Sequence, residues 1–285
     1  MTEIKKPART LAGIAGIVAI ATLISKVVGL VRQQAIAAAF GVGAAANAYS
    51  YAYILPGFLL VLLGGINGPF HSAVVSVLAK RDKKDAAPIV ETITTLVTGV
   101  LLLVTIGLII FAEPLTNLFA PGLNQTQGIS LEQVQVLMQT KAIAIWQLRI
   151  MAPMAVLAGL IGIGFATLNA ADMYWLPSIS PLFSSITVIG GLGILALQLG
   201  SQITAPKYAL LGGIVLAGGT LAGAILQWLV QVIAQWRAGL GTLRLRFDFQ
   251  NPGVQEVLKI MAPATFSSGM LHINVYTDLF FASFI

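Results

Sequence analysis

Two basic residues lie inside the first long apolar segment of the chain, where charge is costly. The segment runs from Thr10 to Gly41, contains no Asp or Glu, and carries Lys26 near its centre and Arg32 six residues later. A cation at the centre of a bilayer costs roughly 2.5–3.5 kcal/mol on insertion scales, so such residues normally face a bundle interior or a water-filled cavity. At about 3.6 residues per turn, the two side chains lie within about 120° of each other. The pattern therefore predicts that both cations reach one cavity, and that this cavity receives an anionic ligand.

A second interpretation of these cations needs no cavity. A long Lys or Arg side chain can extend along the helix toward the headgroups while its stem stays in the apolar layer. This alternative suits Arg32, which lies nearer the far end of the segment, better than Lys26, which lies close to its middle. Both interpretations require the segment to span a membrane.

The composition is that of an integral membrane protein. The 285 residues are 57% hydrophobic and only 9% charged, whereas soluble domains carry about 25% charged residues. The absence of cysteine excludes disulfides, thiol catalysis and cysteine-based zinc sites. The net charge of +6 does not indicate nucleic-acid binding, because the cations gather in loops between apolar segments.

Seven apolar segments are long enough to cross a bilayer, which takes about 20 residues in a helix. The expected fold is therefore an all-α polytopic membrane protein with about seven transmembrane helices. A stretch rich in Gly and Pro, residues 64–69, interrupts the second segment and predicts a bent or broken helix whose freed backbone is buried or lines a cavity. We expect the segments at residues 10–38, 46–78, 89–112, 142–170, 178–199, 208–236 and 254–284.

Basic residues in alternate loops predict the orientation. Because Lys and Arg concentrate on the cytoplasmic side, the N-terminus is expected in the cytoplasm. The outer loop, 113–139, should contain a short interfacial helix. The inner segment, 239–253, could form a short amphipathic strand at the headgroups, where its two arginines either meet anionic lipid or only anchor the topology. The basic residues that set the orientation are Lys5, Lys6, Arg9, Lys80, Arg81, Lys83, Lys84, Arg237, Arg244 and Arg246.

Polar side chains on the second segment are further candidates for the cavity. Asn47 and Asn67 lie near its expected position, where an amide can bind a phosphate or sugar, or form a hydrogen bond to another helix. His71 follows the Gly-Pro break and could titrate near neutral pH. A structural hydrogen bond is the simpler interpretation for this histidine.

An acid inside the seventh segment predicts an ion site. Asp278 directly follows Thr277 and lies one turn after Asn274. Oxygen ligands at this spacing suit a hard cation such as sodium, and a carboxyl in this position could instead carry a proton. The alternative is that Asp278 pairs with a cation on another helix.

No combination of side chains typical of an enzyme is found in the sequence. The only histidines, His71 and His272, lie on different segments without a third metal ligand at suitable spacing. A phosphate-binding Gly loop followed by Lys and Ser/Thr is also absent. We therefore expect no catalytic residues and no cofactor, apart from sodium or proton coupling.

The first two segments resemble the N-terminal signature of the MurJ/MviN lipid II flippases. The matching residues are Ser25-Lys26-Val27-Val28-Gly29-Leu30-Val31-Arg32, Ala39-Phe40-Gly41, Asn47-Ala48-Tyr49 and Leu55-Pro56. This family belongs to the multidrug/oligosaccharidyl-lipid/polysaccharide exporter superfamily. The flippases of the family have fourteen helices in two lobes around a cationic central cavity and work by alternating access.

The resemblance implies a fold, a substrate and a set of site residues. Residues 1–237 would form the N-lobe with six transmembrane helices, and 238–285 the inter-lobe connection and the first helix of the C-lobe. Because the chain stops inside apolar sequence, we expect the rest of the transporter, its C-terminal half, to be missing. The residues implied in substrate binding are Ser25, Lys26, Arg32, Asn47 and Asn67, and those implied in sodium binding are Asp278, Asn274 and Thr277.

The activity implied by the resemblance is transport for cell-wall synthesis and cell shape. The protein would flip lipid II, the undecaprenyl-diphosphate-linked peptidoglycan precursor, from the inner to the outer leaflet of the bacterial inner membrane. Membrane lipids would be further partners. Gln33 and Asn47 stand where the family usually has acids, and Leu60 and Val61 where it usually has an arginine pair, so this cavity is less charged than usual. The alternatives are an exporter of another lipid-linked glycan or of an amphipathic drug, or a membrane scaffold that transports nothing.

Overall fold

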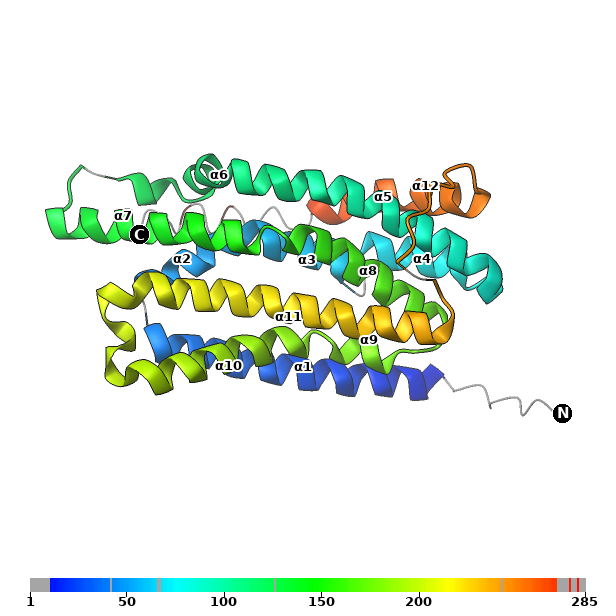
Figure 1. Ribbon diagram of the computed structural model, residues 1–285, viewed down its shortest axis with the longest axis horizontal. Helices are drawn as coiled ribbons and strands as arrows, with labels where there is room; N and C mark the ends of the chain where they lie inside the picture. Colours follow the sequence, from blue (N-terminus) through cyan, green and yellow to red (C-terminus); the bar gives the residue numbers. More distant parts are fainter. Residues whose placement is uncertain are drawn as a thin grey trace.

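The chain folds into an elongated bundle of helices that lie side by side along its long axis (Figure 1). The computed structural model describes residues 11–41, 43–65, 68–125, 127–241 and 243–270, together with Thr277 and Phe281. Throughout these residues the regular structure is helical, and they contain no β-strand. The all-α fold expected from the sequence is confirmed.

The first apolar segment forms one uninterrupted helix, α1 (Leu11–Phe40). It contains no proline, so every backbone N–H after the first turn can bond within the helix. One side of α1 packs against α10 (Leu182–Leu199) and α9 (Trp175–Ile179). Leu23 and Leu30 remain largely exposed on its surface. Much of α1 is therefore uncovered in this part of the protein.

The second segment consists of three helices, α2 (Ala44–Ala52), α3 (Ile54–Gly64) and α4 (Pro69–Leu78). The predicted break is confirmed, because α3 ends at Gly64 and α4 begins with Pro69. A proline fits this first helical position, since its missing N–H would have no intrahelical partner there.

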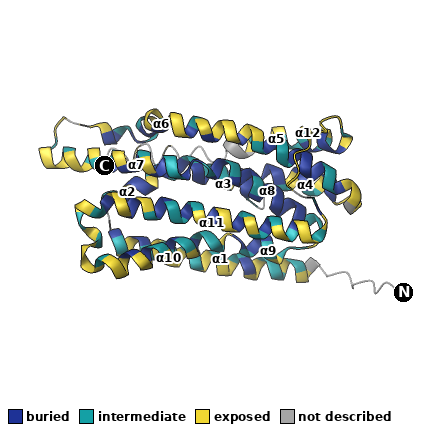
Figure 2. Ribbon diagram, in the orientation of Figure 1, coloured by how far each residue is buried: buried dark blue, intermediate teal, exposed yellow. Residues whose placement is uncertain are grey.

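The helices on either side of the break, α3 and α4, both pack on α8 (Met154–Ala170). Most of α8 is buried, and it forms the dark blue centre of the bundle in Figure 2. Gly162 of α8 lies directly against the Leu63 carbonyl, and a Cβ at Gly162 would overlap that oxygen. A glycine at this crossing therefore lets the two backbones approach closely.

The third segment is α5 (Lys83–Ile110), and the loop that follows contains two short helices. These are α6 (Ala112–Phe119) and a 3-10 helix, η1 (Pro121–Asn124). The short helix expected in this loop is confirmed.

The expected start of the fourth segment, at residue 142, is wrong, because α7 (Leu131–Met151) begins well before it. Ser130 and Gln133 form a capping box. The Gln133 N–H donates to Ser130 Oγ at 3.3 Å, and the Ser130 N–H donates to Gln133 Oε1 at 2.9 Å. Hydropathy marked only the apolar part of this helix, whereas its polar first turns extend beyond the apolar belt. A bend of 42° separates α7 from α8.

The remaining segments form a hairpin and a final described helix. A pair of 3-10 helices, η2 (Gly200–Thr204) and η3 (Pro206–Tyr208), joins α10 to α11 (Ala209–Ala238), and α10 packs closely on α11. The last helix is α12 (Pro252–Met270), which packs on α4.

The amphipathic strand considered for residues 239–253 is not formed, because residues 243–248 have irregular backbone. A strand needs a partner for its ladder of hydrogen bonds. Here the backbone N–H of Arg246 instead donates to Thr95 Oγ1 of α5 at 3.0 Å.

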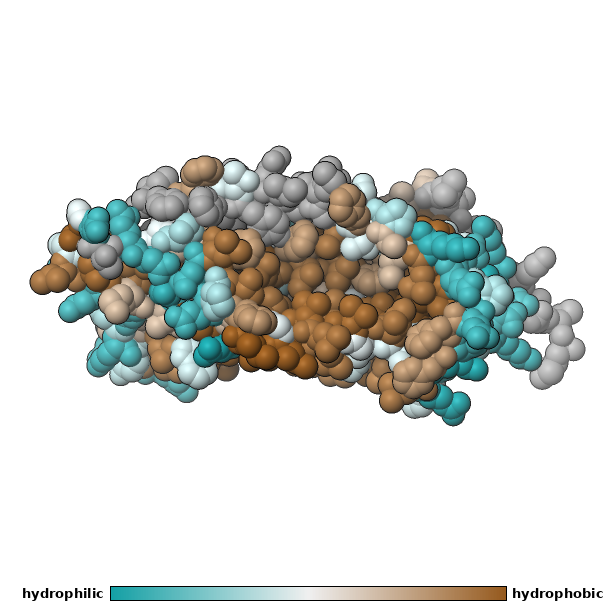
Figure 3. All heavy atoms as spheres, turned by 90° about the horizontal axis from the view of Figure 1, so that it is seen from above, coloured by the Kyte–Doolittle hydropathy of each residue, from teal (hydrophilic) through white to brown (hydrophobic). Residues whose placement is uncertain are grey.

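The described residues contain five candidate spans that are long and apolar enough to cross a membrane. The number of candidate spans is six if the bent α7–α8 pair is counted as one span. The described part of the seventh expected span is α12, and most of the remainder of that segment lies outside the described residues. The molecular surface in Figure 3 has an apolar belt between two hydrophilic ends. The chain is thus a multi-pass membrane protein.

Candidate functional site

The two cations that the sequence singled out lie on the uncovered helix α1. Lys26 is exposed and Arg32 is half-buried. Neither forms an ion pair with any residue that the structure describes. Since no acid neutralises them there, their charges remain available to an anion.

Arg32 lies beside a pair of tyrosines. It lies within electrostatic range of Tyr49 and Tyr53, whose rings stack with centroids 5.5 Å apart. The Tyr49 hydroxyl is hydrogen-bonded to Thr220 Oγ1 at 2.7 Å, which ties α2 to α11. The Arg32 Nε is buried and has no hydrogen-bond partner among the described residues. A buried donor without a partner costs free energy, so a ligand that bound this N–H would first need the surrounding side chains to move.

The other residues predicted to bind substrate are only partly placed. Ser25 is half-buried on α1, and Asn47 is exposed on α2. Asn67 lies outside the described residues. The structure therefore places Ser25, Lys26 and Arg32 on one helix, with Asn47 on the next, and their role as substrate ligands stays a prediction.

Of the predicted sodium ligands, only Thr277 is described, and it is exposed. Asp278 and Asn274 lie outside the described residues, as does His272. The sodium site thus stays a prediction from the sequence.

His71 has the structural role that the sequence favoured. Its Nε2 lies 2.9 Å from the Asn169 amide nitrogen, and its ring meets Phe165 edge-on with centroids 5.9 Å apart. Both partners belong to α8, so His71 joins α4 to α8.

Sequence reasoning did not single out a third cation, Arg149, as a site residue. It is half-buried in the last turn of α7, just before the bend, and its guanidinium carbon lies 5.9 Å from the centre of the Trp146 ring. This distance is within the range of a cation–π interaction. The signal was present, since Arg149 is the one charged residue in the fourth apolar segment, 142–170.

The sequence also did not lead us to predict a role for the buried glutamines. Gln147 is fully buried on α7, and its amide nitrogen donates to the carbonyls of Ala45 at 3.3 Å and Gly213 at 3.1 Å. On α11, the Gln231 amide donates to Ser180 Oγ at 2.9 Å. Glutamines inside apolar helices could have been noticed as helix-joining groups.

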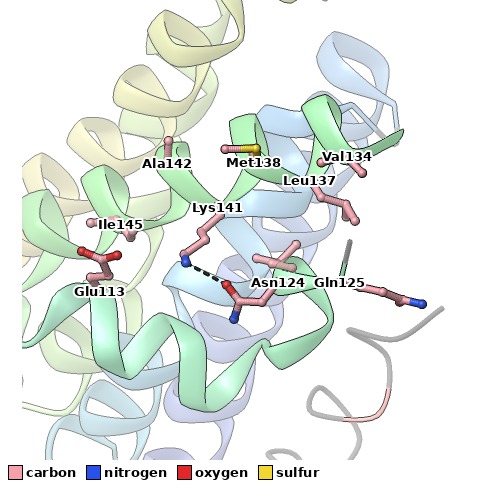
Figure 4. A pocket seen from close by; sticks show the side chains of 10 residues that line it. Glu113, Asn124, Gln125, Val134, Leu137, Met138, Lys141, Ala142 and Ile145 are labelled. Carbon is pink, nitrogen blue, oxygen red and sulfur yellow. Dashed lines mark hydrogen bonds between the residues drawn. The ribbon is translucent and has the colours of Figure 1, made fainter. Parts of the chain in front are cut away.

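A pocket of about 400 Å³ lies between α7 and the loop with α6 and η1. In Figure 4, Lys141 points from α7 toward Asn124 of η1, and its Nζ donates to Asn124 Oδ1 at 2.7 Å. Glu113 of α6 lies at the same pocket. The hydrogen bond between Lys141 and Asn124 joins η1 to α7.

Two ion pairs fasten the segment after α11 to the earlier helices. Arg246 lies 3.3 Å from Glu91 of α5, and Arg81, which follows α4, lies 3.0 Å from Glu256 of α12. These pairs lie at the end of the bundle where α1 begins (Figure 1).

Comparison with known proteins identifies the family. The family model described as "Lipid II flippase MurJ" matches residues 36–285. The chain belongs to the MurJ family. Lys26 and Arg32 precede the matched range, but they fall within the match to a MurJ relative from Synechocystis sp., which is 63% identical over all 285 residues.

Further MurJ relatives agree with this assignment. The Synechocystis protein is matched over 51% of its own length. A protein from Haemophilus influenzae is matched over 49% of its length, and both are named "Probable lipid II flippase MurJ". The Haemophilus protein is 30% identical, over 93% of this chain. A solved structure, "Lipid II flippase MurJ, inward closed conformation", shares the fold with a TM-score of 0.68 and 24% identity, over 94% of this chain and 50% of that one. This chain spans about half the length of the curated MurJ relatives it matches.

Proposed function

We propose that the chain is the N-terminal half of a flippase that moves lipid II from the inner to the outer leaflet by alternating access. The match of residues 36–285 to the MurJ family carries this proposal. In this proposal residues 1–237 are the N-lobe, and 238–285 are the inter-lobe connection and the first helix of the C-lobe. The activity is transport and not catalysis.

The cations of α1, which form no ion pair with the described acids, supply the chemistry for binding a lipid-linked diphosphate. Arg32 can bind phosphate oxygens through two parallel N–H donors, and Lys26 acts as a flexible point charge. A hydrogen bond to a charged group contributes about 1.5–3 kcal/mol, which is enough for binding while still allowing release. The isoprenoid tail can stay in the bilayer while these groups replace water around the headgroup.

The uncovered face of α1 supports a two-lobe arrangement. Leu23, Leu30 and Lys26 are exposed there in the described half. In a two-lobe transporter the second lobe rocks against the first around a central site. We place the C-terminal half opposite this face, so that the cations line the cavity between the lobes.

The basic end of the bundle supports a cytoplasmic N-terminus in the bacterial inner membrane. The end of α4 and the start of α5, with Lys80, Arg81 and Lys84, lie at the end where α1 begins (Figure 1). Lys and Arg are enriched in cytoplasmic loops. Alternating access then carries the headgroup away from this end.

Coupling to sodium is the part of the proposal that rests on Asp278, with Asn274 and Thr277 as further ligands. Oxygen ligands of this kind suit a hard cation. Replacing sodium by choline in the transport assay should slow the wild type more than Asp278→Asn. Equal transport rates with and without sodium, in both the wild type and Asp278→Asn, would contradict the proposed sodium site.

Complementation of a bacterium depleted of its own lipid II flippase tests the function. The complete reading frame should restore growth, and Lys26→Ala with Arg32→Ala should abolish rescue. Lys207→Ala, a change of an exposed cation in η3 at the other end of the bundle, should leave rescue intact. Failure of the wild-type protein to rescue while it is present in the membrane would favour another lipid-linked glycan as the substrate.

A further inference from the structure

A groove on the side of the bundle lies apart from the cations of α1. It runs between α9 and α11, has a volume of about 560 Å³, and falls within the range of about 300–1,000 Å³ typical of small-molecule sites. We call it the α9–α11 groove. All but one of its side chains are apolar, and it is lined by Met173, Leu176, Val230, Ile233, Ala234, Arg237 and Ala238.

The one charged side chain of the groove is Arg237, in the last turn of α11. Arg237 is exposed, and it forms no hydrogen bond or ion pair within the described part of the chain. Asp172 precedes Met173 of the groove wall, and it already accepts a hydrogen bond from the Tyr174 hydroxyl at 2.8 Å. The groove therefore combines an apolar floor with an available positive charge.

Two tryptophans indicate the depth of the groove in the membrane. Trp236 is 67% exposed beside Arg237, and Trp175 is 45% exposed beside Leu176. Exposed tryptophans concentrate at the boundary between acyl chains and headgroups. Arg237 is thus placed where lipid phosphates lie, and the apolar residues of α11 continue from it toward the bilayer centre.

We propose that the α9–α11 groove binds a phospholipid with an anionic headgroup. One acyl chain lies along the apolar floor, and the phosphate accepts hydrogen bonds from Arg237. Charge complementarity selects this occupant, because a zwitterionic headgroup would bring a cation close to Arg237. Basic pockets between helices on the cytoplasmic side are suited to anionic lipid headgroups. The proposal stands independently of what the protein transports.

Lipid retention measured by native mass spectrometry tests the proposal. The protein expressed from its complete reading frame is stripped of lipid in detergent and titrated with phosphatidylglycerol or phosphatidylcholine. The wild type should bind phosphatidylglycerol more tightly. Arg237→Gln should weaken this binding about fivefold, as expected from the contribution of one basic residue near a charged membrane surface, while binding of phosphatidylcholine stays unchanged.

Two further variants separate charge from shape. Arg237→Lys should keep the preference for phosphatidylglycerol, and Ala234→Trp, which fills the floor of the groove, should weaken binding of both lipids. Arg244→Gln is the matched control, because Arg244 is an exposed arginine outside the groove lining. Should Ala234→Trp fail to fold, the comparison of Arg237→Gln with Arg237→Lys still tests whether binding of phosphatidylglycerol requires the positive charge.

Three results would overturn the proposal. The first is equal binding of phosphatidylglycerol by the wild type and Arg237→Gln, which would leave Arg237 only the role of complementing the negative end of the α11 dipole. The second is equal affinity of the wild type for both lipids. The third is displacement of phosphatidylglycerol by lipid II in the wild type but not in Arg237→Gln, which would assign the groove to the substrate.

Discussion

The guanidinium of Arg246 lies 3.3 Å from the carboxylate of Glu91, although 155 residues separate them in the chain. The Glu91 side chain is only 8% exposed, whereas that of Arg246 is 43% exposed. The Arg246 N–H also donates to Thr95, one turn further along α5. The segment between α11 and α12 is therefore attached to α5 by both its backbone and a side chain.

Arg246→Met should destabilise the protein more than Glu91→Gln. The first change removes the cation that lies 3.3 Å from a largely buried carboxylate, whereas the second removes the negative charge itself. We expect a loss of about 1–3 kcal/mol for Arg246→Met, at the low end because Arg246 is partly exposed. Thermal unfolding in detergent measures the effect. Arg244→Met, an equally basic and exposed neighbour, is the control, and an equal loss in both arginine variants would contradict the role of the pair.

Gly162→Ala should prevent correct packing of α3 on α8. A Cβ there would overlap the carbonyl oxygen of Leu63, and backbone cannot move aside as a flexible side chain can. Overpacking of this kind costs about 1–3 kcal/mol or more. Gly190→Ala is the matched change, because Gly190 of α10 has open space where its Cβ would lie. The yield of folded protein in size-exclusion chromatography should fall for Gly162→Ala only, and equal yields would contradict the close crossing.

Gln147→Leu should weaken the contact of α7 with α2 and α11. The Gln147 amide bonds to carbonyls of both neighbours, and hydrogen bonds between membrane helices contribute about 0.6–1.7 kcal/mol. The melting temperature should therefore drop moderately. Gln198→Leu, on the exposed surface of α10, should leave it nearly unchanged. A melting temperature for Gln147→Leu that equals that of the control would show that the two bonds contribute nothing.

The apolar pattern predicted the spans well because bilayer thickness sets their length. It also predicted the break at residues 64–69, since Gly and Pro act locally. The start of α7 was missed because hydropathy does not detect a helix that continues into the aqueous phase. The capping box at Ser130 and Gln133 was the local signal for it.

Contacts between distant residues could not be predicted in this way. Tyr49 and Thr220 meet at 2.7 Å across 171 residues of sequence, and nothing in either neighbourhood indicates the other. The same holds for the position of Arg32 beside Tyr49. The sequence indicated which cations are costly in a membrane, but only packing determines what surrounds them.

Translocation of lipid II in proteoliposomes tests the role of the α1 cations most directly. Fluorescent lipid II is placed in both leaflets, and a membrane-impermeant reductant destroys the label that reaches the outer surface. With the wild-type protein from the complete reading frame, the label of both leaflets should be lost. With Lys26→Ala and Arg32→Ala together, only the label of the outer leaflet should be lost, as in protein-free vesicles, while Lys207→Ala should match the wild type. Full loss of label with the double variant would contradict the proposal that Lys26 and Arg32 bind the transported headgroup.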